Sequence, residues 1–227
     1  MSTKLPDAGV GRIRNFLVAS GAVGGVVMGV LLLWGGLKGS PPDAAPLPDH
    51  TFSLAAEDAR RLTDVRHDAR ATGVHRLSTI SPSRVVIPSL GVDAPVVDVS
   101  VHAGELVVPG DVKVVGRWGA GAALGADQGG TLLAGHVDVR GDLGALHQLS
   151  RIEPGAEVYT SDAVGRVQFW TVTSLIVRAK DRLPSWQASG PRRLILVTCG
   201  GPVERREGRW SYRDNVLVTA VPAAVKR

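Results

Sequence analysis

The sequence predicts an all-β fold, a closed or nearly closed eight-stranded β-barrel with short helices. Short runs rich in Val, Ile, Leu and Thr recur from Pro82 to Val221, separated by Gly, Pro or Asp. The run from Val167 to Thr173 alternates in polarity, which is typical of a strand with one buried face. Leu194 to Val197 is apolar throughout, which indicates a central strand buried on both faces.

The N-terminal part contains a stretch without charge, from Phe16 to Leu37, that predicts a membrane anchor. At a rise of about 1.5 Å per residue it is long enough to cross a hydrocarbon core of about 30 Å. It exceeds the apolar region of a cleaved signal peptide, and no small-x-small cleavage site is obvious before Pro41. Lys4, Arg12 and Arg14 precede it and Lys38 alone follows closely, so residues 1–15 are expected in the cytoplasm. The protein is therefore expected in the cell membrane, single-pass, with its catalytic domain extracytoplasmic.

Residues 38–81 are interpreted as an extracytoplasmic stalk or linker. Four prolines open the segment, and a charged stretch from Glu57 to Arg70 follows that can form a short helix. Its apolar positions Leu62 and Val65 are too sparse to bury much surface, so we expect a spacer. One compact domain then covers residues 82–221, an ordinary size for a domain with its own core.

Within that domain we expect eight strands and one helical stretch, Asp142 to Leu149. The expected strands are Arg84–Pro88, Ala94–Val99, Glu105–Pro109, Gly130–Ala134, Ala156–Thr160, Gly165–Ser174, Arg193–Thr198 and Asn215–Val221.

The net charge of +5 comes largely from the N-terminal 40 residues, so the remainder is only weakly basic. No cluster of Lys and Arg is interleaved with aromatic residues, and we therefore expect no nucleic-acid partner.

Cys199 is the only cysteine of the chain, so no intramolecular disulfide can form. It closes the apolar run Leu194 to Thr198 and precedes two glycines, a position that suits either a nucleophile or a buried structural thiol. A nucleophilic thiol needs a base and a donor that stabilises an oxyanion. His136, which follows the buried run Thr131 to Gly135, is the candidate base, although a water-bonded loop histidine would look the same.

Arg213 stands before the last expected strand. Because a guanidinium keeps its proton, near a thiol it can only donate hydrogen bonds or stabilise negative charge. Taken alone, Arg213 could equally form an ordinary surface ion pair with Asp214.

Taken together, these motifs resemble the signatures of the sortase family. Gly135-His136, then Leu196-Val197-Thr198-Cys199, then Tyr212-Arg213 with Asn215 follow one another as the His, Cys and Arg motifs do in that family. The stretch Arg84 to Val96 is similar to the opening strands of sortases, and the resemblance covers about Pro82 to Val221. One position departs, since Ile195 stands where the family usually has Thr. The contexts of Cys199 and Arg213 look most like the actinobacterial class F sortases.

The resemblance implies cysteine transpeptidation at an LPXTG-like C-terminal sorting signal, cut between Thr and Gly. Cys199 would attack the Thr carbonyl, Arg213 would stabilise the oxyanion or position the signal, and His136 would protonate the leaving amine. The Thr198 hydroxyl or amide is expected to complete the oxyanion site, and Trp186 to shape the substrate-binding groove. The alternative for Trp186 is a loop aromatic packed on the barrel.

The expected partners are secreted proteins that bear a sorting signal, a peptidoglycan precursor or another amine acceptor, and the cytoplasmic membrane. No cofactor is expected, and no metal site, because Asp138 and Asp142 are too few to hold a calcium ion.

Other classes of protein fit less well. The Ser-His-Gly-Cys motif of L,D-transpeptidases is absent, and papain-like wall hydrolases normally place their cysteine before their histidine. The remaining alternative is a non-catalytic extracytoplasmic β-barrel that binds wall or surface proteins and buries Cys199 as packing.

Overall fold

The computed structural model describes residues 44–69, 80–102, 105–139, 141–180, 188–206 and 209–223. The expected anchor, Phe16 to Leu37, and the expected groove residue Trp186 lie outside these ranges. Within them, no helix has the length and apolar character needed to span a membrane.

The elements of the structure, in chain order, are β1 (Phe52–Ser53), α1 (Ala56–Ala69), β2 (Arg84–Ile87), η3 (Pro88–Leu90), β3 (Val92–Val99), β4 (Val101–His102), β5 (Glu105–Leu106), β6 (Val115–Trp118), β7 (Gly130–Ala134), β8 (Asp138–Val139), β9 (Asp142–Leu143), η4 (Leu149–Arg151), β10 (Glu157–Ser161), β11 (Val167–Ala179), β12 (Arg193–Arg206) and β13 (Arg209–Pro222).

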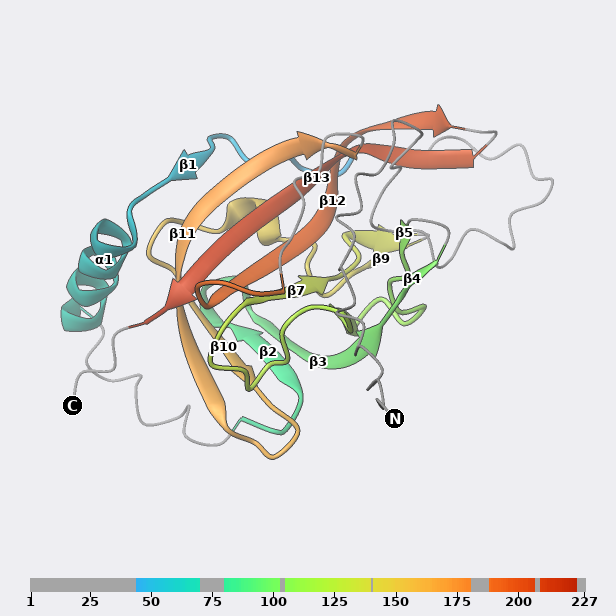
Figure 1. Ribbon diagram of the computed structural model, residues 1–227. Coiled ribbons are helices and arrows are strands. Elements are labelled where there is room, and N and C mark those ends of the chain that lie inside the picture. The colour runs from blue at the N-terminus through green and yellow to red at the C-terminus, as the bar shows by residue number, and fades with distance from the viewer. Residues whose placement is uncertain are drawn as a thin grey trace, which may run out of the picture.

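The main sheet closes on itself, which confirms the predicted barrel (Figure 1). Its nine strands follow the order β1-β11-β10-β2-β3-β6-β7-β12-β13, and β13 also pairs with β11. The two-residue β1 is an addition to the edge of β11, so eight strands form the ring. Most neighbours are antiparallel, but β3 pairs with β6 and β7 pairs with β12 in parallel.

Two expectations about the elements were wrong. Glu105–Pro109 is not a barrel strand, because only Glu105–Leu106 is extended and it pairs with β4 in a separate two-stranded sheet. The barrel strand at that place is β6, which is short and contains Gly116, so its sequence carries no strand pattern. Asp142 to Leu149 is not a helix either, since it begins with β9, continues as a turn and ends where η4 begins.

The run predicted to be buried on both faces lies between two apolar clusters. Leu194 and Leu196 point into the barrel interior, which is the larger cluster and includes the fully buried Trp170. Ile195 and Val197 point to the opposite face, where a second cluster packs against the outside of the sheet. The outer cluster comprises Leu106, Val108, Leu132, Ala134, Ile195, Val197 and Leu217, with the partly buried Val99, Trp118 and Ile176 packed on it.

The first part of the expected stalk packs on the barrel. β1 pairs with β11, Ala59 on α1 is fully buried, and Arg60 donates to the carbonyl of Pro222 over 3.0 Å. The sparse apolar positions of this segment gave no indication of such packing, because one small alanine and a backbone ladder supply much of the contact. Figure 1 shows α1 lying against the side of the barrel formed by β11 and β13.

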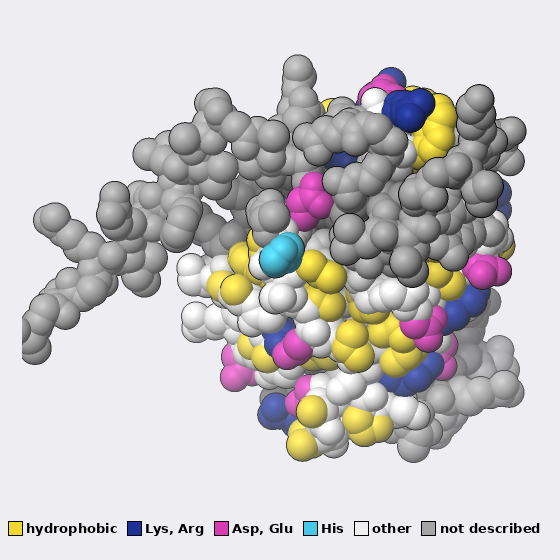
Figure 2. Space-filling model, turned by 90° about the vertical axis from the view of Figure 1, so that its right-hand side faces the viewer, with side chains coloured by type: hydrophobic (Ala, Val, Ile, Leu, Met, Phe, Trp, Pro, Cys, Tyr) yellow, Lys and Arg dark blue, Asp and Glu magenta, His cyan; other side chains and the backbone are white. Residues whose placement is uncertain are grey.

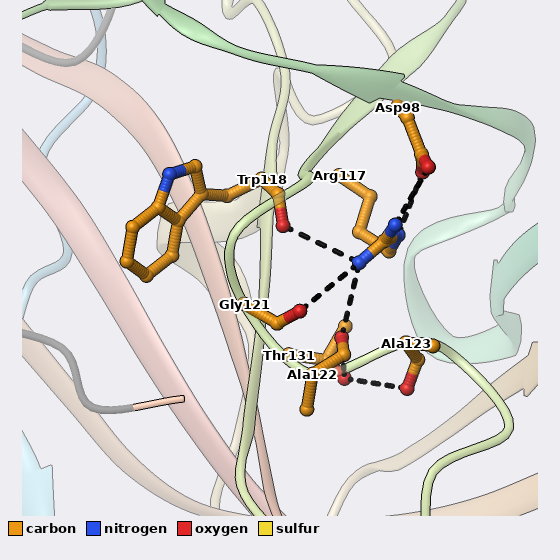
Figure 3. A network of polar contacts seen from close by, with 7 residues as sticks. All are labelled: Asp98, Arg117, Trp118, Gly121, Ala122, Ala123 and Thr131. Atoms are coloured by element: carbon orange, nitrogen blue, oxygen red, sulfur yellow. Dashed lines mark hydrogen bonds and ion pairs between the residues drawn. The ribbon is translucent and has the colours of Figure 1, made fainter. Parts of the chain in front are cut away.

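Arg117 ties β6 to the turn that leads into β7 (Figure 3). Its Nη1 donates to the carbonyls of Trp118, Gly121 and Ala122, each over 3.3 Å. Its Nε and Nη2 donate to the two oxygens of the Asp98 carboxylate over 2.7 and 2.6 Å. This hydrogen bonding by Arg117 lowers the pKa of Asp98. The Thr131 hydroxyl, at the start of β7, donates to the carbonyl of Ala122 in the same turn. The turn is therefore hydrogen-bonded to both β6 and β7.

Hydrophobic side chains also reach the surface on one side of the barrel. Figure 2 shows a broad hydrophobic area there, broken by scattered acidic and basic groups. The exposed hydrophobic residues of the described chain include Val97, Val101 and Leu143, which belong to β3, β4 and β9.

Candidate active site

His136 and Cys199 lie just past the paired part of two neighbouring parallel strands, β7 and β12. In the β7–β12 pair, Ala134 lies opposite Val197. The ladder continues one step further, because the Gly135 amide donates to the Val197 carbonyl over 3.1 Å. His136 comes two residues after Ala134 and Cys199 two residues after Val197, so the register brings both to one edge of the sheet.

Side-chain alternation places Cys199 on the outer face of the barrel. Val197 and its partner Leu217 lie in the outer cluster, and Cys199 pairs with Asn215. Because alternate residues of a strand share a face, Cys199 and Asn215 point outward as well. Arg213, two residues before Asn215, lies on that face too, next to a bulge that interrupts the β12–β13 register between Gly200 and Val203.

The Cys199 thiol is covered. Only 3 % of Cys199 is exposed, and it clusters with Ala45, Val137 and the partly buried Tyr212. Burial raises the pKa of the thiol; the charge of Lys180 and a side-chain hydrogen bond from Lys180 lower it, and the charge of Asp138 raises it. The net direction is upward, so the thiol of this closed structure carries its proton at neutral pH.

The cover over Cys199 comes from the segment before β1. Ala45 and Gly201 exchange two backbone hydrogen bonds of 3.2 and 3.1 Å, which form an antiparallel bridge two residues beyond Cys199. Leu47 also lies against Gly200, where an added Cβ would come within 3.1 Å of its Cδ2. An extended backbone therefore already occupies the sheet edge beside Cys199.

His136 is buried and held by its Nε2, which lies 3.0 Å from the carbonyl oxygen of Pro109. A carbonyl can only accept, so Nε2 carries the proton and the neutral ring offers its lone pair at Nδ1. Burial lowers the pKa of His136, while the Pro109 hydrogen bond and the charge of Asp138 raise it, with a net fall. The ring is thus a neutral base in the resting structure.

The backbone of His136 is enclosed by the turn that follows it. Gly144 passes so close that a Cβ added there would lie 2.0 Å from the His136 carbonyl oxygen. Gly144 donates to the Val137 carbonyl over 2.9 Å, and Leu146 donates to the His136 carbonyl over 3.3 Å. The turn therefore fixes the position of the His136 backbone, from which the imidazole extends.

Arg213 forms the ion pair with Asp214 that its sequence position allowed. Its Nη2 lies 2.8 Å from Asp214 Oδ2, and its Nε donates to both carboxylate oxygens. The pair is asymmetric, since 45 % of the Arg213 side chain is exposed but only 7 % of that of Asp214. The hydrogen bond and charge of Asp214 raise the pKa of Arg213, which keeps its charge at the rim of the site.

Thr198 uses its hydroxyl inside the scaffold. The Thr198 Oγ1 donates to the Gly135 carbonyl over 2.8 Å in a buried contact. That hydroxyl has a single proton, which is used in a hydrogen bond between β12 and the residue before His136. A direct role of Thr198 toward a substrate stays a prediction.

Lys180 is a cation of this site that sequence reasoning missed. It directly follows β11, whose last residue Ala179 lies opposite Asp214 on β13, while Gly200 lies opposite Asp214 on the other side. Only 4 % of Lys180 is exposed, and its Nζ donates to Ser211 Oγ over 2.9 Å. The one available signal was a lysine directly after a long strand, and it does not reveal burial.

Asp138 and Tyr212 link the segment after His136 to β13. The Tyr212 hydroxyl donates to Asp138 Oδ1. Tyr212, the neighbour of Arg213, therefore contacts the segment that follows His136. Among the described residues, no group of three or more His, Cys, Asp and Glu side chains is arranged to hold a metal ion. The residues brought together are a thiol, a neutral imidazole and two cations, which is a set suited to acyl transfer.

Comparison with known proteins finds similarity to sortases in sequence and in fold. The sequence model of the family described as "Sortase domain" matches residues 85–223. Among solved structures, the fold is similar to sortase C1 of Streptococcus agalactiae, with a TM-score of 0.49, 14% identity and coverage of 76% of this chain and 88% of that one. It is also similar to sortase A of Listeria monocytogenes, with a TM-score of 0.45, 13% identity and coverage of 64% and 89%. Sortase E1 of Streptomyces coelicolor has a TM-score of 0.43 and 16% identity over 62% of this chain and 86% of that one. No curated protein sequence matches the chain.

Proposed function

Because the chain belongs to the sortase family, we propose that it is a cysteine transpeptidase that cuts an LPXTG-like C-terminal sorting signal and transfers the cut protein to an amine. The observation that carries this proposal is the parallel register of β7 and β12, which brings His136 and Cys199 to one edge of the sheet.

In the proposed reaction, the Cys199 thiol gives its proton to Nδ1 of His136 as the sulfur adds to the carbonyl carbon of the signal's Thr. The C–N bond to the following Gly then breaks, and the imidazolium returns the proton to the leaving amine. A thioester remains on Cys199. The incoming amine attacks this thioester, His136 takes its proton, and the new amide leaves with the free thiol restored.

Three observations support recognition of a peptide here. Val99, Trp118 and Ile176 are partly buried on the outer cluster, a surface for the apolar residues of a signal. Arg213 carries a charge next to the bulge and can donate to an oxyanion or a peptide carbonyl. Asn215, opposite Cys199 and fully buried, has no hydrogen-bond partner for either polar atom of its amide in the described structure.

The proposal requires the cover to open. Ala45 and Leu47 lie where a peptide would approach Cys199, so the bridge between Ala45 and Gly201 must break before the sulfur can reach a carbonyl. Opening also rehydrates the thiol and reduces the burial that raises its pKa.

We place the domain outside the cell, anchored by residues 16–37, with exported proteins as substrates and a peptidoglycan precursor or another protein's amine as acceptor. The charge-free stretch and the basic residues before it support this placement. The Val-Thr-Cys-Gly-Gly and Tyr-Arg-Asp-Asn contexts support the class F subtype.

The test is the intact mass of the full chain after incubation with a panel of LPXTG-like peptides, with Cys199→Ala as control. A thioester adduct on the wild type alone, removed by an added amine, is the expected result.

The buried thiol also suits the alternative of a non-catalytic binding module. No adduct from any peptide, together with a thiol inert to alkylation in the folded protein, would overturn the transpeptidase and favour that module.

A further inference from the structure

Lys180 occupies a position that a structural role alone explains poorly. A buried ammonium loses several kcal/mol of hydration free energy unless it is paired. In the part of the chain that the structure describes, Lys180 forms no ion pair with a carboxylate, and its hydrogen bond to Ser211 is made to a neutral hydroxyl. The buried charge of Lys180 is therefore balanced by no carboxylate of the described residues.

The backbone register points to the group that can supply the negative charge. Lys180 follows Ala179, and Cys199 precedes Gly200, while Ala179 and Gly200 lie opposite Asp214 from its two sides. Lys180 and Cys199 therefore each lie one residue from the same row of paired residues on three adjacent strands, and the positive charge of Lys180 lowers the pKa of the thiol against the effect of burial. Ionisation of Cys199 would give Lys180 its counter-ion.

We propose that Lys180 is a catalytic residue whose ammonium stabilises the thiolate of Cys199 by its charge and by a hydrogen bond to the sulfur. The role rests on the proposed function, since it matters for catalysis only if Cys199 is the nucleophile. Lys180 keeps its three protons throughout, the thiol proton goes to His136, and the S–C bond forms as described above. Arg213 is paired with Asp214, so in this proposal it does not stabilise the thiolate and interacts with the substrate instead.

The other charged groups around the thiol act differently. Asp138 on β8 opposes ionisation of Cys199, and its carboxylate also accepts from Tyr212 on β13. His136, after β7, is neutral in the resting structure because burial lowers its pKa. Arg213 and Asp214 on β13 neutralise one another. Lys180 is thus the group whose removal should change the ionisation of Cys199 most.

The experiment compares the full chain with its Lys180→Met, Lys180→Arg and Arg178→Met variants. Methionine keeps the unbranched stem without the charge, and arginine keeps the charge. Arg178→Met is the matched control, because Arg178 lies on β11 two residues before Lys180 but is exposed and donates to the carbonyl of Val177. The readout is the rate of Cys199 alkylation by iodoacetamide from about pH 6 to about pH 10, followed by intact mass.

We expect Lys180→Met to move the midpoint of the alkylation profile to higher pH. The rate at neutral pH should fall about tenfold for every pH unit by which the midpoint rises. Lys180→Arg should stay near the wild type and Arg178→Met should match it. A Lys180→Met profile that superimposes on the wild type, in a protein with an unchanged circular dichroism spectrum, overturns the proposal. If the methionine variant does not fold, Lys180→Gln gives the same reading.

Peptide adducts separate this proposal from the proposed function. Iodoacetamide needs no sorting signal, so the alkylation profile tests Lys180 whether or not any peptide reacts. A shifted profile with no wild-type adduct would overturn the transpeptidase and leave the effect of Lys180 on the thiol standing. An adduct that forms equally fast in the wild type and Lys180→Met would overturn the catalytic role of Lys180 and keep the transpeptidase.

Discussion

The Thr198 hydroxyl donates to the Gly135 carbonyl over 2.8 Å in a buried contact between β12 and the segment that follows β7. Thr198 is the neighbour of Cys199 in the chain, and Gly135 is the neighbour of His136. The bond therefore helps to fix the positions of the two residues relative to each other.

Thr198→Val should destabilise the fold, because it leaves the Gly135 carbonyl buried without its side-chain donor. We expect a loss of about 1–3 kcal/mol in the free energy of unfolding, measured by urea titration. The matched control is Thr171→Val, since the Thr171 hydroxyl is buried without a hydrogen-bond partner in the described structure. Equal losses in the two variants would contradict a special role for the Thr198 bond.

Gly144→Ala should impair the reaction through the backbone of His136. The added methyl would meet the His136 carbonyl oxygen at 2.0 Å, so the backbone of residue 136 or of residue 144 must shift, and we expect the imidazole to move with it. A displacement of about 1 Å can lower a catalytic rate on the order of 100-fold. The rate of thioester formation is the measurement, and Gly110→Ala is the control because no heavy atom lies within 4 Å of its Cβ position. A Gly144→Ala protein as fast as Gly110→Ala would rule this out.

The alkylation of wild-type Cys199 should rise steeply with pH. Burial raises the pKa of the thiol, and only the thiolate reacts, so the rate should increase about tenfold per pH unit below that pKa. The rise should continue above about pH 8.5, where the rate for a free cysteine levels off. Glutathione measured in the same buffers is the reference. A profile that levels off at or below the glutathione midpoint would mean that opening, and not ionisation, limits the reaction.

Ala45→Gln should expose the thiol. A longer neutral side chain does not fit against Cys199, and each backbone hydrogen bond lost from the bridge is worth about 1 kcal/mol, or about a fivefold change in the open population. Alkylation at fixed pH should accelerate accordingly. Ala44→Gln is the control, because Ala44 is the exposed neighbour of the same segment. Equal rates in the two variants would show that the bridge does not limit access.

Arg213→Met should separate substrate chemistry from thiol chemistry. Loss of an oxyanion donor lowers acylation by about 10²–10³. Alkylation by iodoacetamide should change little, because the charges that shift the pKa of Cys199 are those of Lys180 and Asp138. Thioester formation with the best peptide and alkylation are measured on the same preparation. A parallel fall in both rates would assign Arg213 to the thiol instead of the substrate.

The barrel could be predicted because most of its strands carry their own pattern. Leu194 to Val197 is apolar on both faces, and the structure packs a cluster against each. β6 could not be found in the same way, since it is short, contains Gly116 and is fixed by pairing on both edges. The packing of Ala45 and Ala59 was not predicted either, because these contacts are made by small side chains and backbone hydrogen bonds.

The ends of the buried runs indicated His136 and Cys199. Each run ends where the parallel pairing of β7 with β12 stops, and both residues lie two positions past that point. The environment of the thiol was not predictable. Arg213 was a candidate to stabilise negative charge near the thiol, but it pairs with Asp214, and burial lowers the pKa of His136. Lys180 reaches the site through strand order, which no local pattern reveals.

The bridge between Ala45 and Gly201 makes the chain a competitor of its own ligands. A tethered segment acts at a fixed effective concentration, which for short flexible tethers is in the millimolar range. The apparent affinity of any peptide for the thiol edge is reduced by the fraction of molecules that are closed. The closed form therefore weakens every peptide by the same factor, so residues 45 and 201 help to set how tightly a peptide binds without affecting which peptide is preferred.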